Sequence, residues 1–234
     1  MMAKNKSKRF EKNAALISAD ARYSLEDAVK LIKQFTPPAF DPTVTLSFSL
    51  GIDPRKSDQM VRSSVSLPHG TGKNVRVLVF AKGEAADAAT AAGAEHVGME
   101  DLIAKVLGGF VDFDVAIATP DAMTEVRKVA RVLGPRGLMP NPKTGTVTDD
   151  VTKAIAEVKA GRVDFKVDKN SNVAAGVGKL SFDESALLEN LTAFIDSVKK
   201  EKPSSLKGAY IRSITVSATM CPGVKLEEQT WINA

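Results

Sequence analysis

The sequence predicts an α+β discontinuous domain with an inserted three-layer α/β (Rossmann-like) domain. Both terminal thirds of the chain contain strands that alternate apolar and polar residues, as in a sheet with one open face. The middle third has short, nearly continuous apolar strands separated by helical patterns, typical of a parallel sheet covered on both faces. Each terminal piece alone has too few elements to bury a core. We therefore expect residues 1–70 plus 161–234 to form one domain and residues 71–160 to form the insertion.

The first terminal piece is expected to contain two helices and two strands. The basic stretch 7–19 is compatible with a short helix, and a cap motif headed by Ser24 begins a better one that ends at Pro37–Pro38. The hydrophobic period then changes to two over residues 43–50, with hydroxyl side chains on the polar face. A second alternating run covers 61–67.

The middle piece alternates strands and helices. The pattern predicts strands at 75–80, 96–97 and 115–118 and helices at about 84–92, about 100–107 and from about 149. Thr119 and Pro120 are expected to be the N-cap and first-turn proline of a helix with Met123 and Leu133 on one side. The dipeptide Ala160–Gly161 marks the second boundary, and glycine-containing crossings at both boundaries would permit hinge motion.

The last piece is expected to contain one long helix and three strands. The strands are predicted at about 163–167, 173–178 and 209–219. Ser181 and Glu184 form a capping box for the helix, and Pro203 stops it.

A proline- and glycine-rich segment, Gly134 to Gly145, interrupts the middle piece. Three glycines and three prolines in twelve residues exclude a helix or a central strand and predict a stiff, irregular loop. Arg136 and Lys143 would be displayed on it. Its two apolar residues, Leu138 and Met139, are either displayed too or folded back onto the core, and the sequence leaves both arrangements open.

Composition narrows the class of protein. With 44% apolar and 26% charged residues, the chain is typical of a globular protein, and no apolar run approaches the roughly 18 residues of a membrane span. A single cysteine, Cys221, excludes an internal disulfide and fits the reducing cytoplasm. We therefore expect a cytoplasmic protein without a membrane partner.

The residues for an enzyme active site are poorly represented. The two histidines, His69 and His96, are most simply structural, and no cluster has the spacing of metal ligands. The turn after the strand ending at Phe80 has one glycine and an acid where a dinucleotide site needs several glycines. Gly70–Lys73 resembles a phosphate loop, but a strand pattern follows it rather than a helix. The prediction is that the chain is not an enzyme and binds no cofactor or metal.

Basic and hydroxyl side chains favour nucleic-acid binding. The net charge of +4 equals the charge of the N-terminal arm alone, where Lys4, Lys6, Lys8, Arg9 and Lys12 face only Glu11. A second basic group without acids comprises Arg127, Lys128, Arg131, Arg136 and Lys143. The polar faces of two strands carry Thr43, Thr45, Ser47 and Ser49, and Ser213, Thr215, Ser217 and Thr219. Such hydroxyls can bind ribose and backbone in the shallow RNA minor groove. Ordinary solvated surfaces would look the same, so these patterns alone leave both interpretations open.

Several motifs, in order along nearly the whole chain, resemble those of the large-subunit ribosomal protein L-one family. The longest is Gly-Pro-Arg-Gly-Leu-Met-Pro-Asn-Pro-Lys, from Gly134, followed by Gly145-Thr146-Val147. The others are Ser57-Asp58-Gln59 with Arg62, Leu67-Pro68-His69-Gly70-Thr71-Gly72-Lys73, Ala92-Gly93-Ala94-Glu95 with Val97-Gly98, Phe113-Asp114, Ala160-Gly161 and Thr219-Met220. The resemblance implies the same two-domain layout.

The resemblance also implies a function without catalysis. The chain would be a structural part of the large ribosomal subunit, bind its rRNA at the mobile stalk and assist release of deacylated tRNA from the exit site. It would also repress translation of its own operon mRNA. The implied RNA site lies where the first and last strands meet. Phe40 and Thr43 are expected at the entry of the first strand, and Ser213, Thr219 and Met220 at the exit of the last, with Ser217 on the same hydroxyl face. Arg127, Arg131, Arg136 and Lys143 would make secondary contacts.

The sequence departs from the family pattern at several positions. Cys221 and Ser171 replace usual glycines, Ser63 replaces the glycine after Arg62, and Ala39 replaces a lysine often found before the aromatic. These changes affect the expected close approach of the backbone at residue 221 and some peripheral contacts, but not the overall binding mode. Two other classes are kept as alternatives: a nucleotide-binding enzyme that uses the α/β insertion, and a protein-interaction scaffold that retains no RNA.

Overall fold

The structure is a computed structural model that describes residues 7–18 and 21–227, with only the backbone described at Ser57 and Lys143. The chain divides into two compact units. Unit 1 comprises Met1–Gly72 and Val163–Ala234, and unit 2 comprises Lys73–Arg162. The expected boundaries, after residues 70 and 160, lie two residues from these divisions. Lys4 and Lys6 of the basic arm lie outside the described residues.

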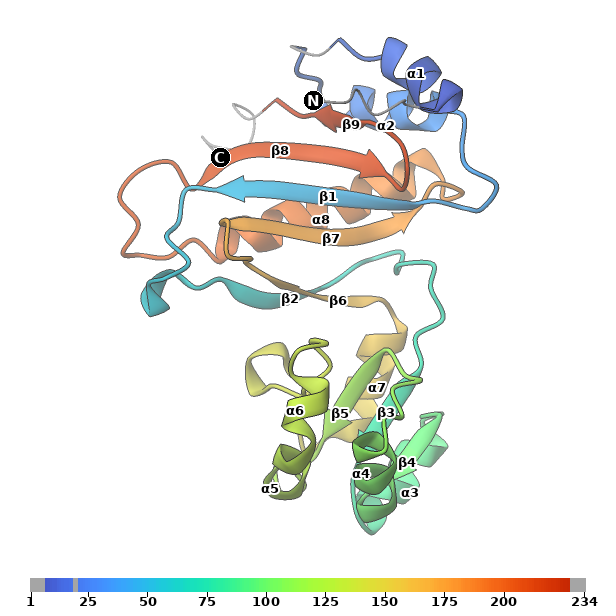
Figure 1. The fold of residues 1–234 in the computed structure, drawn as a ribbon, viewed down its shortest axis with the longest axis vertical. Helices are drawn as coiled ribbons and strands as arrows, with labels where there is room; N and C mark the ends of the chain where they lie inside the picture. Colours follow the sequence, from blue (N-terminus) through green and yellow to red (C-terminus); the bar gives the residue numbers. More distant parts are fainter. Residues whose placement is uncertain (1–6, 19–20, 228–234) are drawn as a thin grey trace. The chain divides into compact units, whose positions relative to one another are not determined.

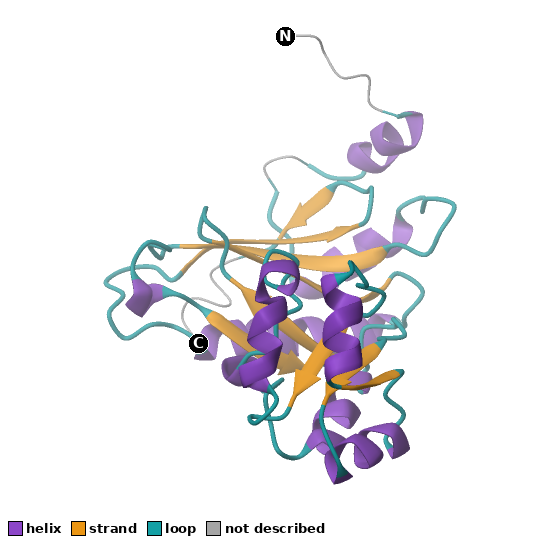
Figure 2. Ribbon diagram, turned by 60° about the horizontal axis from the view of Figure 1, so that its bottom comes forward, coloured by secondary structure: helices purple, strands orange, loops and turns teal. Residues whose placement is uncertain are grey.

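Unit 1 is built on an antiparallel sheet with the strand order β7-β1-β8-β9 (Figures 1 and 2). Its strands are β1 (Thr43–Leu50), β7 (Asn172–Lys179), β8 (Ile211–Ala218) and β9 (Gly223–Lys225), and β2 (Arg62–Ser66) pairs separately with β6 (Arg162–Lys166). Its helices are α1 (Lys8–Ala15), α2 (Leu25–Gln34) and α8 (Glu184–Lys200), with a 3-10 turn η1 (Ser57–Gln59). Strand β1, from the N-terminal piece, lies between two strands of the C-terminal piece. The two ends of the chain therefore share one sheet.

One face of this sheet is buried and the other is open. Residues of β1 alternate between buried and half-buried, so Leu46 and Phe48 point into the core while their neighbours point outward. The core side is covered by α2 and α8, and α8 lies behind the strands in Figure 1. The ring of Phe48 packs at 5.8 Å from that of Phe194 on α8. Burial of each such side chain contributes about 1.5–3 kcal/mol to folding.

Unit 2 has three layers around a parallel sheet with the order β4-β3-β5. The strands are β3 (Val77–Phe80), β4 (His96–Gly98) and β5 (Val115–Ala118). The helices are α3 (Glu84–Ala91), α4 (Glu100–Leu107), α5 (Met123–Val126), α6 (Ala130–Leu133) and α7 (Val151–Lys159), with 3-10 turns η2 (Arg127–Val129) and η3 (Pro142–Thr144). Val77 and Val79 pack with α3 and α7, and Leu78 and Phe80 pack with α4 and the α5–α6 segment. Both faces of β3 are therefore buried, as its continuous apolar sequence predicts.

Two predicted helix starts are wrong. Thr119 and Pro120 do not begin a helix, because α5 starts at Met123 behind Ala122, which makes no side-chain cap, and a 3-10 turn then separates α5 from α6. Ser181 is not the cap of α8. Its hydroxyl instead donates to the Asp41 carboxylate at 2.7 Å, and Asp183 occupies the N-cap position. Strand β9 pairs with the second half of β8 and was not predicted from the sequence.

The loop from Gly134 to Gly145 is anchored to unit 2 rather than displayed as a whole. Leu138 and Met139 are half-buried and pack against the core of α4 and β3, so the folded-back arrangement is the one observed. Thr144 and Thr146 are buried, and their hydroxyls donate to the carbonyl of Asn141.

Within residues 7–18 and 21–227, no helix is long and apolar enough to cross a membrane.

Candidate nucleic-acid interface

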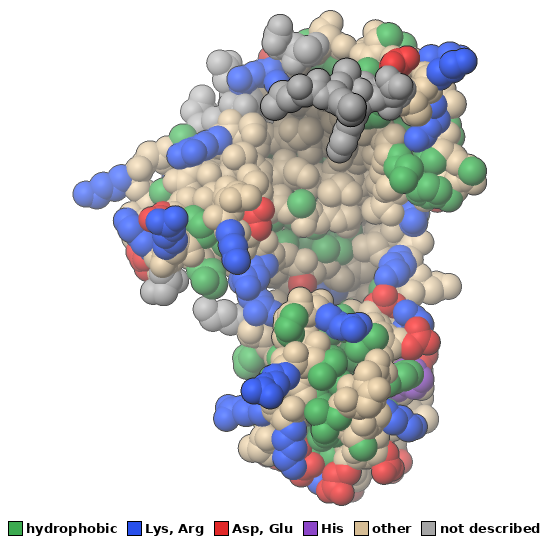
Figure 3. All heavy atoms as spheres, viewed as in Figure 1, with side chains coloured by type: hydrophobic (Ala, Val, Ile, Leu, Met, Phe, Trp, Pro, Cys, Tyr) green, Lys and Arg blue, Asp and Glu red, His purple; other side chains and the backbone are tan. Residues whose placement is uncertain are grey.

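The open face of the antiparallel sheet carries a ladder of hydroxyl groups. Cross-strand neighbours point to the same side of a sheet. The pairs between β1 and β8 are Thr45 with Ser217, Ser47 with Thr215, and Ser49 with Ser213. Opposite them, β7 offers Asn172, Ala174 and Gly176, and β9 offers Gly223 and Lys225. These outward positions contain no acid. In Figure 3 the described part of this face is mostly tan, the colour of uncharged polar side chains and backbone.

The ladder ends where β1 begins and β8 finishes, and hydrogen bonds tie the two strands together there. The Thr219 N–H donates to the Thr43 carbonyl at 3.0 Å, and the Thr43 N–H donates to the Thr219 hydroxyl oxygen at 3.2 Å. That hydroxyl also lies 3.2 Å from the Thr43 carbonyl. Thr219 is nevertheless exposed, so one hydroxyl both closes the sheet and faces solvent.

Two apolar side chains project beside this end of the sheet. Met220 is 66% exposed and Phe40, three residues before β1, is 50% exposed. Met220 has a φ of +60°, a left-handed conformation that is uncommon outside glycine. A tight turn forms because the Cys221 N–H donates to the Ala218 carbonyl at 2.9 Å, and this turn directs Met220 outward. An exposed aromatic ring and an exposed thioether can pack on bases and riboses.

Two cations that were not predicted as site residues lie at the same end of the sheet. Lys179, the last residue of β7, is paired with Thr43 and donates to its hydroxyl at 3.1 Å. Arg9 of α1 donates to the Met220 carbonyl at 3.3 Å. Only the pairing of distant segments brings them here, so no local pattern in the sequence could have marked Lys179. Arg9 does belong to the basic arm, which was the available signal.

The expected site residues divide into two groups. Thr43, Thr219 and Met220 are brought together, with Phe40 close in the chain and Ser217 two residues before Thr219. Ser213 was expected at the exit of the last strand, and this placement is wrong. It lies at the third position of β8, opposite Ser49 and roughly 20 Å from Thr219 at about 3.3 Å per residue.

The departures from the family pattern are compatible with this geometry. Cys221 does not adopt a positive φ, and its half-buried side chain packs against the core of unit 1, so it leaves the open side free. Ser171 has a φ of +64°, as expected at a position where glycine is usual. Its hydroxyl donates to the Ile52 carbonyl at 2.8 Å, which supports this conformation.

The secondary basic residues all belong to unit 2. Arg127 lies in η2, Arg131 in α6 and Arg136 in the following loop, and the three side chains are exposed. Lys143 lies in η3, but its side chain is outside the described residues. These residues form a basic flank on the α5–α6 segment, with no acid between Val126 and Thr148.

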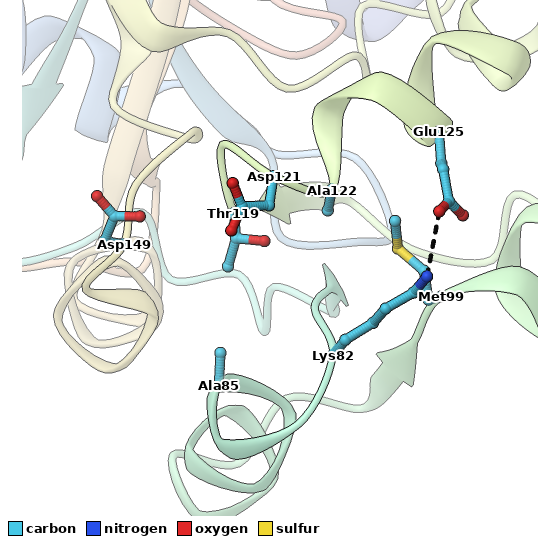
Figure 4. A pocket seen from close by; sticks show the side chains of 8 residues that line it. All are labelled: Lys82, Ala85, Met99, Thr119, Asp121, Ala122, Glu125 and Asp149. Atoms are coloured by element: carbon cyan, nitrogen blue, oxygen red, sulfur yellow. Dashed lines mark hydrogen bonds and ion pairs between the residues drawn. The ribbon is translucent and has the colours of Figure 1, made fainter.

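Unit 2 also contains a polar pocket where ligands of α/β proteins usually bind, beyond the carboxyl ends of parallel strands. Its volume is about 350 Å³, and Asp121, Glu125 and Asp149 line it together with Lys82 (Figure 4). Lys82 donates to Glu125 at 3.1 Å, which raises the pKa of the lysine. An acidic lining whose lysine is already paired repels phosphate, so the geometry disfavours a nucleotide site. Among the described residues, no group of His, Cys, Asp or Glu is arranged to hold a metal.

Comparison with known proteins gives a consistent result. Residues 31–222 match the model of the Ribosomal protein L1p/L10e family. The chain is 57% identical to the large ribosomal subunit protein uL1 of Beutenbergia cavernae over 221 residues, which is 94% of this chain and 93% of the relative. It is 55% identical to the protein of the same name from Mycolicibacterium gilvum, over 97% of this chain and 94% of the relative.

A chain with two such units and an open hydroxyl face on one of them has the features of a protein that binds a partner along a surface. The chain belongs to the ribosomal protein L1p/L10e family. The resemblance found in the sequence is thereby confirmed, and so is the prediction of a non-enzymatic protein.

Proposed function

We propose that this chain is a structural constituent of the large ribosomal subunit, in the cytoplasm, and that it binds the rRNA of the mobile stalk through unit 1. What supports the first part is that its close relatives are large-subunit proteins by name. The second part, rRNA binding, is supported by a single observation, which is the composition of the sheet end at Thr43, Thr219 and Met220. It combines exposed apolar side chains, hydroxyls and nearby cations.

The chemistry of this end suits folded RNA. Uncharged hydroxyls can exchange hydrogen bonds with ribose 2′-OH groups, while Phe40 and Met220 cover unstacked bases. Lys179 and Arg9 would neutralise phosphates at the rim. Asp41 is the acid nearest in the chain, and its carboxylate is occupied by the Ser181 hydroxyl and backbone N–H. The basic flank of unit 2, with Arg127, Arg131, Arg136 and Lys143, would contribute weaker contacts.

Two further activities follow from the same proposal. By family resemblance, the chain would assist release of deacylated tRNA from the exit site and would repress translation of its own operon mRNA. For the mRNA to use the Met220 site, it must compete with rRNA for the free protein.

The test uses the full chain, purified, with labelled large-subunit rRNA and small-subunit rRNA as the matched control. We expect tight retention of the large-subunit RNA that falls steeply as salt rises, and a single compact footprint on that RNA. Equal retention of both RNAs, or none, would contradict the proposal. A transcript covering the start of the protein's own operon should displace the rRNA, and Met220→Asp should weaken both complexes in parallel.

A further inference from the structure

Helix α1 contacts the turn that carries Met220 and the segment that leads to Phe40. Arg9 and Asn13 are four residues apart, so they lie on one face of the helix. Arg9 donates to the carbonyl of Met220 at 3.3 Å. Asn13 is 1% exposed and reaches the same turn, with its amide nitrogen 3.8 Å from the sulfur of Cys221. One helix face thus touches the backbone of one site residue and the side chain of the next.

Asn13 also holds the segment that leads to Phe40. Its amide nitrogen donates to the Thr36 carbonyl at 3.1 Å, and its amide oxygen accepts from the Thr36 N–H at 3.0 Å. These two hydrogen bonds fix the orientation of Thr36, the residue after the C-cap of α2. Pro37 and Pro38 follow, and their rings lock φ. The direction set at Thr36 is therefore carried with little freedom toward Phe40.

The turn at Met220 needs such support. A non-glycine residue at a φ of +60° is maintained only where surrounding contacts hold it. Within the described part of the chain, the contacts are the Arg9 bond to its carbonyl, the Cys221 N–H bond and the Asn13 amide against Cys221.

We infer that α1 is part of the RNA site, with Asn13 as a positioning residue that holds Phe40 and Met220 at a fixed separation. The inference rests on the proposed function, because it assigns a role within the same site. In this chain Cys221 stands where the family usually has glycine, and the inference makes Asn13 the structural partner of its side chain. It also explains why a polar side chain is buried in a short helix whose Lys8, Glu11 and Lys12 are exposed.

The α1 surface also offers charges for phosphates. Lys8 and Lys12 form a second pair at four-residue spacing, one residue before Arg9 and Asn13, and both are exposed. Their face of the helix adjoins the face that touches the turn. Lys8 and Lys12 are therefore expected to contact RNA directly, whereas Asn13 acts through the residues it holds.

Asn13→Ala separates positioning from charge, because asparagine is neutral. We expect the Kd for large-subunit rRNA to rise about tenfold, while the slope of log affinity against log salt stays unchanged because no phosphate contact is lost. The double variant Lys8→Ala/Lys12→Ala should instead lower that slope by about 1–2. Should Asn13→Ala fail to fold, Asn13→Gln, which shifts the amide by one methylene, serves with the same expectation.

The single cysteine supplies a readout that simple destabilisation would not move. Alkylation of Cys221 in the free protein should be faster in Asn13→Ala than in the wild type, because the turn no longer rests on α1. The matched control is Val198→Ala on α8, which removes a fully buried side chain from the core of unit 1. Below its melting temperature this control should keep both the wild-type Kd and the wild-type alkylation rate.

The inference is overturned if Asn13→Ala keeps the wild-type Kd and alkylation rate, or if Val198→Ala loses as much affinity as Asn13→Ala. A wild-type protein that retains no large-subunit rRNA would instead overturn the proposed function itself.

Discussion

The two sheets of this molecule present themselves to solvent in opposite ways. The antiparallel sheet of unit 1 is covered on one side by α2 and α8 and leaves a whole face open. The parallel sheet of unit 2 is covered on both sides, and its central strand β3 is buried throughout. The open face is lined by hydroxyls and small side chains, whereas the carboxyl ends of the parallel strands open onto Asp121, Glu125 and Asp149.

This difference separates two kinds of binding surface. A broad open face with accessible backbone suits an extended polymer, whereas a pocket at strand ends suits a small solute. The acidic lining of the pocket would repel RNA phosphates, and the face of unit 1 has no outward acid along its central strands. This difference supports our proposal that RNA binds the antiparallel sheet, although the α/β unit carries the more familiar ligand-binding topology.

The largest effect is expected from Met220→Asp. A carboxylate at this exposed position would face RNA phosphates, and such like-charge contacts cost several kcal/mol, so affinity should fall about a hundredfold. Folding stability should stay unchanged, because the side chain is 66% exposed and aspartate tolerates a left-handed φ. Met60→Asp is the matched control. Met60 is 50% exposed in the same unit and lies beyond the end of β1 that is distant from Met220. Its substitution should change the Kd less than threefold, which corresponds to less than about 0.7 kcal/mol.

Thr219→Val tests whether RNA binds the end of the sheet or its whole face. Loss of the hydroxyl should weaken binding about tenfold, and it should lower the free energy of unfolding by about 1 kcal/mol because Thr43 loses its acceptor. Thr215→Val changes a half-buried hydroxyl in the middle of β8, the strand that precedes Thr219, and should alter the Kd less than twofold, or about 0.4 kcal/mol. Equal losses in titrations of the two variants would show that contacts extend along the ladder.

Arg127→Ala tests the contribution of the basic flank of unit 2. We expect a loss of about two- to threefold and a decrease of at most about 0.9 in the salt slope, because at most one phosphate contact is removed. Filter binding at four salt concentrations measures both quantities. A loss as large as that of Thr219→Val would contradict a site centred on the sheet of unit 1.

The smallest effect on binding is expected from Asp114→Asn, which perturbs unit 2 alone. Partial desolvation raises the pKa of Asp114, but hydrogen bonds from Lys73 and Arg76 outweigh this effect and hold the pKa below the ordinary value of an aspartate. Since the folded-state pKa is the lower one, the ionised carboxylate stabilises the fold at pH values above the ordinary pKa of an aspartate, and this contribution is lost as the pH falls through the folded-state pKa. The variant should lose at most about 1 kcal/mol of stability at pH 7, because its partners are largely exposed. Chemical denaturation at pH 7 and pH 3 measures this, and the Kd for RNA should not change.

Much of the fold could be predicted because the periodicity was local and strong. The alternation over residues 43–50 matches β1, and the pattern after Ser24 matches α2, where the Ser24 hydroxyl accepts from the Asp27 N–H as expected of a cap. The long helix ending before Pro203 is also observed as α8. In each case the apolar residues lie on one face, so packing and propensity favour the same structure.

The errors arose where a distant partner competed with a local motif. Ser181 could cap α8, but its hydroxyl binds Asp41, which is 140 residues away. Ser213 and Thr219 lie far apart because β8 is extended between them. Their shared residue type and hydroxyl pattern carry no information on this distance. Lys179 and Arg9 reach the candidate site only through strand pairing and the packing of α1. Such positions depend on tertiary contacts and are not encoded in a short window of sequence.

Oxidative footprinting of the protein, with and without large-subunit rRNA, tests the central claim most directly. Met220, Phe40 and Met60 are all at least half exposed in the free chain, and their side chains can be compared in one experiment. The account predicts that bound RNA protects Met220 and Phe40 from oxidation and leaves Met60 as reactive as before. Unprotected Met220 in a saturated complex, or equal protection of Met60, would contradict an RNA site at the end of the antiparallel sheet.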